Sequence, residues 1–454
     1  MTASAPSPSP VELTIQNMAN GGDGVGRLPD GRVAFVDGAL PGETVAIAPP
    51  GPGRFVRAPL LALPRPPSPA RLPEPRCRHF GAWPERGRRP AVHCGGCQWQ
   101  HASYEAQLVY KAEVLRDCLV RIGGLTDPPV APTLGMDQPW GYRNHLRVRL
   151  AGGRPALVAQ DGASLLPIDV CPIAHPLVLD LLSCLELDLP DGTEVGLRAG
   201  IHTGDRLIAI HAPAAELAEV DVELDVSVTL LDPETGAVHV AAGRPFLVER
   251  LGGRAFMVPA NAFFQVNTAM AEHLVARVGA WLPAAGERLI DLYSGVGTFS
   301  VLLADRFQEV VAVEAHGPAV AAAVDNASGL EQVQLVEASA AEGLAWALEG
   351  TGGRDTDCLL LDPPRAGLDR ETLGLLGGAA ARTMIYVSCD PATLARDAGR
   401  LAAAGWVLEA SQPIDMFPQT HHVESVNRFT RDARTASEGR SEDRSEDHRV
   451  AAEG

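Results

Sequence analysis

The feature that most constrains the fold is an alternation of short apolar runs with stretches of helical period, which begins at Phe256. This alternation is typical of a parallel sheet covered by helices on both faces. Helices are expected over Thr268–Trp281 and Phe299–Phe307. We therefore predict a doubly wound, Rossmann-like α/β domain over residues 256–429. Its expected strands include Arg288–Tyr293, Val310–Val313, Val333–Val336, Leu359–Leu361 and Met384–Val387.

The first of these strands runs into Ser294-Gly295-Val296-Gly297-Thr298, a turn whose glycines let the backbone approach a bound nucleotide closely. A lone G-x-G is weak and also occurs in nicotinamide- and flavin-binding proteins, but Ser300 replaces the third glycine of that longer pattern. Glu314 ends the next strand and is placed to accept hydrogen bonds from both ribose hydroxyls. Because Asp291 opens the motif as in class I methyltransferases, the pattern favours S-adenosylmethionine. The residues expected at this site are Asp291, Tyr293, Gly295, Gly297, Thr298, Glu314, Asp362 and, against the adenine amine, Ser339.

The last of these strands delivers Cys389 to its carboxyl end, where Asp390 and Pro391 stop it. In an open α/β sheet, that edge carries ligands and catalytic groups. A free cysteine is more often a small core hydrophobe, so its position alone leaves packing and nucleophilic catalysis both open. Asp362-Pro363-Pro364-Arg365 ends the preceding strand. Arg365 stands where many N-methyltransferases have an aromatic residue, which argues against simple N-methylation.

Residues 11–63 have the pattern of a small all-β module, with turn chemistry at Gly21–Gly26. Small β-barrels often bind single-stranded nucleic acid. The segments Gly24–Arg27, Gly31–Val36 and Pro41-Gly42-Glu43 resemble the TRAM domain, an RNA-binding barrel. A generic SH3-like barrel with a structural role remains an alternative. Proline-rich residues 64–75 are expected to form a semi-rigid linker.

The eight cysteines include a C-x-x-C turn, Cys94-Gly95-Gly96-Cys97, which Cys77 precedes and Cys171 follows. Four thiolates with one pair at this spacing suit either a tetrahedral zinc ion or an iron-sulfur cluster, and the spacing does not choose between them. A disulfide pair is a third alternative and the least favoured in the cytosol. Cys118 and Cys184 fall in expected helices and are assigned to packing.

Trp140–Leu150 has a strand pattern that sorts basic and apolar side chains onto opposite faces. The net charge of −18 argues against casual polyanion binding, so any contact with RNA must be local. A basic stripe on this strand is a reasonable surface for a phosphate backbone, although an ordinary solvated strand face has the same pattern. The candidate RNA-binding residues are Arg143, His145, Arg147 and Arg149.

Several of these motifs together resemble the bacterial RNA uracil-C5 methyltransferases that act on large-subunit (23S) ribosomal RNA. The resemblance is carried by Cys94–His101, Cys171-Pro172-Ile173, Asp362–Arg365, Ser388–Pro391 and His421–Glu424. It implies that Cys389 adds to C6 of a uridine and that Glu424 removes the C5 proton after methyl transfer. It also implies that Gln265 and Asp362 position the cofactor and the base.

The same resemblance implies that a [4Fe–4S] cluster is bound by Cys77, Cys94, Cys97 and Cys171. The chain departs from the family by the inserted residues 82–91, which makes Cys77 the least certain ligand. Transfer-RNA uridine-C5 methylation, cytosine-C5 RNA methylation and a non-catalytic RNA-binding iron-sulfur protein remain alternatives. We place ribosomal RNA first because the transfer-RNA members of the family typically lack the TRAM module and the cluster.

The expected fold class is therefore multidomain, α+β and α/β. Residues 1–10 are expected to be disordered, 11–63 to form the TRAM-like barrel, 64–75 a linker and 76–255 a central RNA-binding β-rich domain. Residues 256–429 form the predicted methyltransferase domain, followed by a polar tail over 430–454 that is expected to be disordered. No signal pattern or membrane-length apolar run is present, so we expect a cytoplasmic protein, and a monomer.

Overall fold

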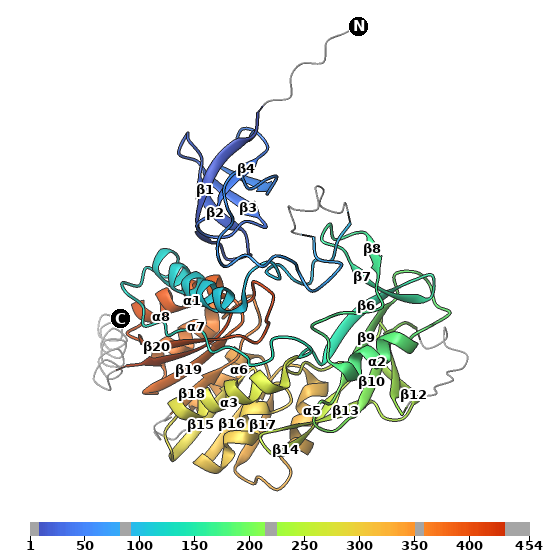
Figure 1. Cartoon of the computed structure of the whole chain (residues 1–454). Coiled ribbons are helices and arrows are strands. Elements are labelled where there is room, and N and C mark those ends of the chain that lie inside the picture. The colour runs from blue at the N-terminus through green and yellow to red at the C-terminus, as the bar shows by residue number, and fades with distance from the viewer. Residues whose placement is uncertain (1–8, 82–91, 214–224, 350–357, 432–454) are drawn as a thin grey trace, which may run out of the picture.

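The computed structural model describes residues 9–81, 92–213, 225–349 and 358–431. It has a small N-terminal β-module, a central β-rich part and a C-terminal α/β part (Figure 1). This arrangement confirms the predicted fold class. The expected insertion at 82–91 lies outside the described residues, as do positions 1–8 and most of the expected tail. Thr430 is the last residue of a strand and does not belong to the tail.

The N-terminal module is a five-stranded sheet of order β4-β1-β2-β3-β5. The second half of the expected turn at Gly21–Gly26 belongs to a strand, Gly24–Arg27, and β5 was not predicted. Glycine is needed at position 26 because a Cβ atom there would lie 2.6 Å from the carbonyl oxygen of Thr14 on the adjacent strand. The strands are β1 (Val11–Met18), β2 (Gly24–Arg27), β3 (Val33–Asp37), β4 (Thr44–Ile47) and β5 (Phe55–Pro59).

The segment predicted as a linker is anchored to this module by a buried ion pair. Arg71 Nε lies 2.6 Å from Glu43 Oε1, and both side chains are almost fully buried. The same carboxylate also accepts hydrogen bonds from the backbone amides of Leu40 and Ser68. Residues 64–75 are therefore packed against the barrel along part of their length.

The central part is a seven-stranded sheet of order β12-β11-β10-β9-β6-β7-β8, followed by the separate hairpin β13-β14. The boundary that we expected after residue 255 falls inside β14 of this hairpin. The strands are β6 (His145–Ala151), β7 (Arg154–Val158), β8 (Leu165–Pro167), β9 (Glu194–Ala199), β10 (Arg206–His211), β11 (Ser227–Leu231), β12 (Val238–Ala242), β13 (Phe246–Leu251) and β14 (Arg254–Pro259), with helix α2 (Pro176–Cys184) against β9 and β10.

Helix α1 (Tyr104–Arg121) lies within residues 76–255, which we expected to form the central domain. It packs on the C-terminal part instead. Leu115 and Leu119 of α1 share one hydrophobic core with Leu394 and Ala398. These last two residues belong to α8 (Pro391–Ala403), and Figure 1 shows α1 beside α8, away from the central sheet. A segment that neighbours the cysteine motif in sequence thus packs on the C-terminal part.

The C-terminal part is a seven-stranded sheet of order β17-β16-β15-β18-β19-β21-β20, with only β21 antiparallel to its neighbours. The strand order reverses between β15 and β18, and such a point is where open α/β sheets bind ligands. The elements are α3 (Thr268–Trp281), β15 (Gly286–Leu292), α4 (Thr298–Leu303), η3 (Ala304–Arg306), β16 (Phe307–Glu314), α5 (Gly317–Asn326), β17 (Val333–Glu337), α6 (Ala340–Glu349), β18 (Cys358–Leu361), α7 (Arg370–Gly378), β19 (Thr383–Ser388), α8, β20 (Val407–Ile414) and β21 (Glu424–Thr430).

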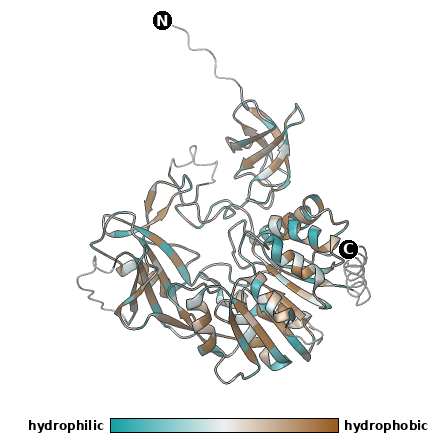
Figure 2. Ribbon diagram, turned by 180° about the vertical axis from the view of Figure 1, so that it is seen from behind, coloured by the Kyte–Doolittle hydropathy of each residue, from teal (hydrophilic) through white to brown (hydrophobic). Residues whose placement is uncertain are grey.

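Hydrophobic side chains fill both faces of this sheet, as the brown colour of its strands indicates (Figure 2). One core lies under α1, α6, α7 and α8, and the other lies under α3, α4 and the β13-β14 hairpin. This two-sided burial explains the continuous apolar runs in the sequence. No helix among the described residues is both long and apolar enough to span a membrane.

Candidate active site and cysteine site

The register of two antiparallel strands brings the two expected catalytic residues together. Ser388 of β19 pairs with Ser425 of β21. Cys389 directly follows this last pair and Glu424 directly precedes it, and the charge of Glu424 is among the causes that raise the pKa of Cys389. The sheet itself thus places a thiol and a carboxyl group as neighbours at its carboxyl edge.

The Cys389 thiol is half-buried, and its surroundings raise its pKa to about 12. Burial is the largest cause, followed by the negative charges of Glu424 and Asp362. The guanidinium of Arg365 acts in the opposite direction and lowers the pKa. The pKa of the thiol therefore falls, and more of the nucleophilic thiolate forms, when its acidic neighbours are neutralised or when a cation beside it interacts more strongly with the sulfur.

Glu424 is buried, and burial together with the nearby Asp362 raises its pKa well above the ordinary value. Arg365 again opposes this shift. The Arg365 side chain is exposed and also contacts His422, with a distance of 3.2 Å from Nη2 to His422 Nδ1. One arginine thus lies within electrostatic reach of both the thiol and the carboxyl group.

The glycine turn after β15 contains three left-handed positions at alternate residues. Tyr293 has φ 63°, which is uncommon for a residue with a side chain. Gly295 and Gly297 have φ 57° and 83°, and Gly297 caps α4. Glu314 Oε2 accepts a hydrogen bond of 2.9 Å from the amide of Gly295, so its carboxylate is held directly beside the turn.

Two polar atoms beside this turn fit the methionine part of S-adenosylmethionine. Asp291 is fully buried, burial raises its pKa to about 7, and one of its carboxyl oxygens bonds to Ser300. Its other carboxyl oxygen, and the hydroxyl of Ser294, have no hydrogen-bond partner within the described part of the chain. Buried polar atoms need partners, and an amino and a carboxylate group would supply them.

The remaining expected cofactor residues differ in how closely they approach this site. Asp362 follows β18, and burial and the charge of Asp291 raise its pKa to about 7. Gln265 is buried, and Thr298 opens α4. Ser339 is exposed and exchanges hydrogen bonds with Glu342 at the start of α6, as in a capping box. The serine thus already has a structural role in capping this helix.

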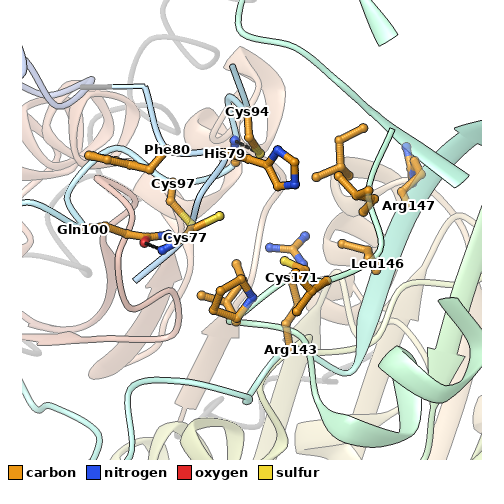
Figure 3. Close-up of a pocket in the computed structure, with 16 residues that line it drawn as sticks. Cys77, His79, Phe80, Cys94, Cys97, Gln100, Arg143, Leu146, Arg147 and Cys171 are labelled. Atoms are coloured by element: carbon orange, nitrogen blue, oxygen red, sulfur yellow. Dashed lines mark hydrogen bonds between the residues drawn. The ribbon is translucent and has the colours of Figure 1, made fainter. Parts of the chain in front are cut away.

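The four expected metal-binding cysteines surround one cavity of about 170 Å³ (Figure 3). A single water needs only about 10–15 Å³ measured in this way, so the cavity has room for a group of several atoms. Gln100 reaches the same cavity, and its Oε1 accepts a hydrogen bond of 3.0 Å from the amide of Cys77. The chain therefore brings all four cysteines together, although they lie in separate segments of the sequence: Cys77, Cys94, Cys97 and Cys171.

Burial raises the pKa of each of these thiols, to about 11 for Cys94. The negative charge of the neighbouring cysteines contributes in the same direction. A ligand that brings positive charge would relieve both causes, so the thiols fit a metal-containing group. Within the described ranges, no three histidine, cysteine or acidic side chains are grouped closely enough to hold a single metal ion. Cys118 is buried as expected, but Cys184 is exposed because α2 ends there.

The expected RNA-binding stripe opens onto a second cavity, of about 620 Å³. Arg143, His145 and Arg147 line it, whereas Arg149 does not. Arg147 and Arg149 both form ion pairs with Glu194, at 3.2 and 3.8 Å. The stripe is also less basic than we expected at His145, because burial and the surrounding arginines lower the pKa of its imidazole well below the ordinary value.

Some residues of this region could not be recognised in the sequence. Arg198 and His211 come from β9 and β10 and complete the basic lining of this second cavity. Phe263 stands at its rim with 68% of its surface exposed, which is unusual for phenylalanine. The only signal was its position two residues before Gln265, since nothing in a loop sequence tells an exposed aromatic from a buried one.

Two family models match the chain. The model described as tRNA (Uracil-5-)-methyltransferase matches residues 244–431, and the TRAM domain model matches residues 9–48. An RNA methyltransferase of Thermosynechococcus vestitus is 36% identical over 92% of this chain and 98% of its own length. Another, from Streptomyces avermitilis, is 36% identical over 91% of this chain and 96% of its own length.

Among solved structures, the tRNA (uracil-54, C5)-methyltransferase of Pyrococcus abyssi, in complex with S-adenosyl-L-homocysteine, is similar in fold. The TM-score is 0.68 and the sequence identity 23%, over 92% of this chain and 99% of that one.

Proposed function

The chain belongs to the family of S-adenosylmethionine-dependent RNA uracil-C5 methyltransferases, and from that premise we propose that it methylates C5 of a uridine through a covalent adduct with Cys389. The observation that carries this proposal is the strand register that makes Cys389 and Glu424 neighbours at the carboxyl edge of the sheet. A thiol and a carboxyl group in this position supply the nucleophile and the base that the reaction needs.

C5 of uracil is a weak nucleophile, so the ring must be activated before it can accept a methyl group. The Cys389 thiolate adds to C6, and the displaced electron pair forms an enolate over C5, C4 and O4. C5 then attacks the methyl carbon of the sulfonium and the S–CH₃ bond breaks, which leaves S-adenosylhomocysteine. Arg365 favours the thiolate, because its guanidinium lowers the pKa of Cys389.

The intermediate then carries both a methyl group and a proton on C5. The Glu424 carboxylate removes that proton, the C–H electron pair restores the C5=C6 double bond, and the bond from C6 to the Cys389 sulfur breaks. The raised pKa of Glu424 suits a group that must accept a proton near neutral pH. Removal of the C5 proton and release of the Cys389 thiolate are therefore coupled in one step.

S-adenosylmethionine is expected beside the glycine turn after β15, where Asp291 and Ser294 offer polar atoms without partners in the described structure. Glu314 and Asp362 lie at the carboxyl ends of β16 and β18, on either side of that turn. The cofactor supplies an electrophilic methyl group. The chain's own residues hold it at the sheet edge that also presents Cys389.

RNA is expected to enter along the cavity lined by Arg143 and Arg147 and to pass Phe263. The arginines suit phosphates, and the exposed ring offers a surface on which a base can stack. The target C5 is shielded in a stacked helix, so the uridine must be flipped out or lie in a loop. We place 23S ribosomal RNA first as substrate, supported by the TRAM module and the cysteine site, with transfer RNA as the alternative.

The cysteine site is expected to hold a [4Fe–4S] cluster. The support is the grouping of four partly buried thiols around a cavity with room for several atoms. Such a cluster would supply positive charge that neutralises the thiolates and would fix the segments that carry them. We assign it no step in methyl transfer.

The test is tritium release from RNA that contains 5-tritiated uridine, with ribosomal and transfer RNA in separate reactions. We expect release that depends on S-adenosylmethionine and is faster with ribosomal RNA. Faster release from transfer RNA would make transfer RNA the preferred substrate and would leave the proposed reaction unchanged. Methylation without tritium release would exclude uracil C5 as the acceptor.

A further inference from the structure

The irregular segment Asp415–Val423, called here the base loop because it leads directly into Glu424, is bound by distant parts of the chain. Lys111, the sole lysine of the chain, is fully buried and donates to Asp415 Oδ1 at 2.6 Å and to the carbonyl of Phe417 at 3.0 Å. Tyr142 donates to the carbonyl of Pro418 at 3.0 Å. The loop before the catalytic base is thus fixed mainly from outside the C-terminal sheet.

Gln419 is the most constrained residue of the base loop. It is buried and has φ 72°, a left-handed conformation that costs energy for a residue other than glycine. Its carbonyl oxygen accepts hydrogen bonds from the amides of Gln98 and Trp99, at 3.1 and 3.0 Å. These two amides directly follow Cys97, one of the four cysteines around the cavity.

Side chains reinforce the same connection. Gln107 of α1 donates to Gln419 Oε1 at 3.0 Å and accepts from the Gln419 amide at 2.9 Å. Gln98 donates to the carbonyl of Gly95 at 2.6 Å and accepts from the amide of His421 at 3.4 Å. A continuous path of hydrogen bonds therefore runs from the C-x-x-C turn to the base loop.

We propose that Gln98, Gln107 and Gln419 are positioning residues through which the cysteine site holds Glu424 in place for removal of the C5 proton. This inference rests on the proposed function. A strained Gln419 persists only while its neighbours hold it, and those neighbours belong to the C-x-x-C segment and α1. When the segment around Cys97 loosens, the base loop relaxes and Glu424 moves.

The proposal predicts which step of the reaction fails. Cys389 follows β19 and lies outside the base loop, so we expect addition to C6 and methyl transfer to be affected less than proton removal. Proton removal needs Glu424 within hydrogen-bond reach, and a displacement of about 1 Å can cost roughly 10²-fold. Enzyme with a disturbed base loop therefore accumulates as the methylated covalent adduct.

The experiment compares Gln98→Ala and Gln107→Leu with the control Gln412→Leu in the full chain. Gln412 is also buried and donates to backbone carbonyls of Pro132 and Pro413, but it makes no bond to the base loop. The measured quantities are the rates of adduct formation and of tritium release from 5-tritiated RNA. In Gln98→Ala and Gln107→Leu, we expect tritium release to be about 10- to 100-fold slower while adduct formation stays near normal. In the control, we expect the ratio of the rate of release to the rate of adduct formation to be unchanged.

A second measurement does not depend on catalysis. Amide hydrogen exchange over residues 415–424 is followed in the wild type and in Cys97→Ser, without RNA. We expect at least tenfold faster exchange in Cys97→Ser, because the amides that hold Gln419 lose their anchor. Unchanged exchange in Cys97→Ser would overturn the proposal, and so would an equal slowing of adduct formation and release in the two glutamine variants.

The two arms separate this inference from the function on which it rests. If the wild type releases no tritium, the proposed reaction fails, while the exchange measurement still decides whether the cysteine segment holds the base loop. Gln98→Ala removes a half-exposed side chain, so it provides a second route if Gln107→Leu does not fold.

Discussion

Two regions of the chain present partly buried thiols at a cavity or a sheet edge, and the surroundings of these thiols differ in kind. Cys389 is a single thiol that faces Glu424, with Asp362 raising its pKa and Arg365 lowering it. At the cysteine site, four thiols line one cavity, and the negative charges of neighbouring cysteines are among the causes that raise the pKa of Cys94 and Cys97. The first arrangement balances a thiol between opposite charges, whereas the second gathers groups that repel one another as anions.

On the proposed function, this difference separates a thiol that reacts from thiols that bind a metal-containing group. A nucleophile must form and break a bond, so a nearby cation and a nearby base are both useful to it. Thiolates that repel one another in a buried cavity need a permanent positive partner. Hydrogen bonds join the C-x-x-C segment to the base loop, and the positioning role proposed above makes this the route by which a change at the cysteine site reaches Glu424.

The largest expected effect comes from Cys389→Ala, which removes the balanced thiol. Methyl transfer should fall by at least about 10³-fold, because no group remains to activate the ring. S-adenosylmethionine binding, measured by calorimetry, should be unchanged because the glycine turn is untouched. Residual transfer near the wild-type rate would mean that Cys389 is only a packing residue.

Cys94→Ser tests the other side of the comparison. We expect loss of the visible absorbance of an iron-sulfur cluster in protein prepared without oxygen, and a lower midpoint of thermal unfolding. The matched control is Cys184→Ser, because that thiol is exposed and lies outside the cavity. A colourless wild type that contains one zinc ion would decide against the cluster while keeping the site.

Arg365→Gln tests whether the charge of Arg365 activates the Cys389 thiol. Arg365 lowers the pKa of Cys389, so its removal raises that pKa and leaves less thiolate at a given pH. The pH–rate profile should move to higher pH, and the rate at pH 7 should fall by roughly 3- to 10-fold, because the charge of an exposed arginine is screened by solvent. Arg370→Gln, at the exposed start of α7, serves as the control. A profile that keeps its midpoint would remove Arg365 from the activation of the thiol.

Phe263→Ala touches neither thiol region, and its expected effect is of similar size. Loss of one stacked base should weaken RNA binding by about tenfold. Filter binding at a fixed salt concentration measures this change, and both the cluster absorbance and S-adenosylmethionine binding should stay the same. Unchanged RNA affinity would place the RNA elsewhere.

The sequence predicted most of the C-terminal sheet because buried parallel strands leave continuous apolar runs, and α3 begins and ends where expected. It misplaced α1, since an amphipathic helix does not reveal which sheet will cover its apolar face. The position of Cys389 at the edge of the sheet could be predicted, because this residue follows the end of an expected strand. Its proximity to Glu424 depends on the register of β19 and β21, which no local pattern encodes.

The path through Gln98, Gln107 and Gln419 was also invisible in the sequence. Nothing in the local sequence distinguishes a buried glutamine from an exposed one, and no sequence pattern predicts the left-handed conformation of Gln419. Strain and long-range hydrogen bonds are set by tertiary packing, so functional links of this kind require the structure.

The most direct test of the covalent account uses Glu424→Gln with RNA and S-adenosylmethionine, followed by denaturation and peptide mass spectrometry. Without the carboxylate, the C5 proton stays and the thiol cannot leave. The account predicts a stable adduct in which a methylated uridine is linked to Cys389. A variant that turns over freely, or an adduct on any other residue, would contradict it.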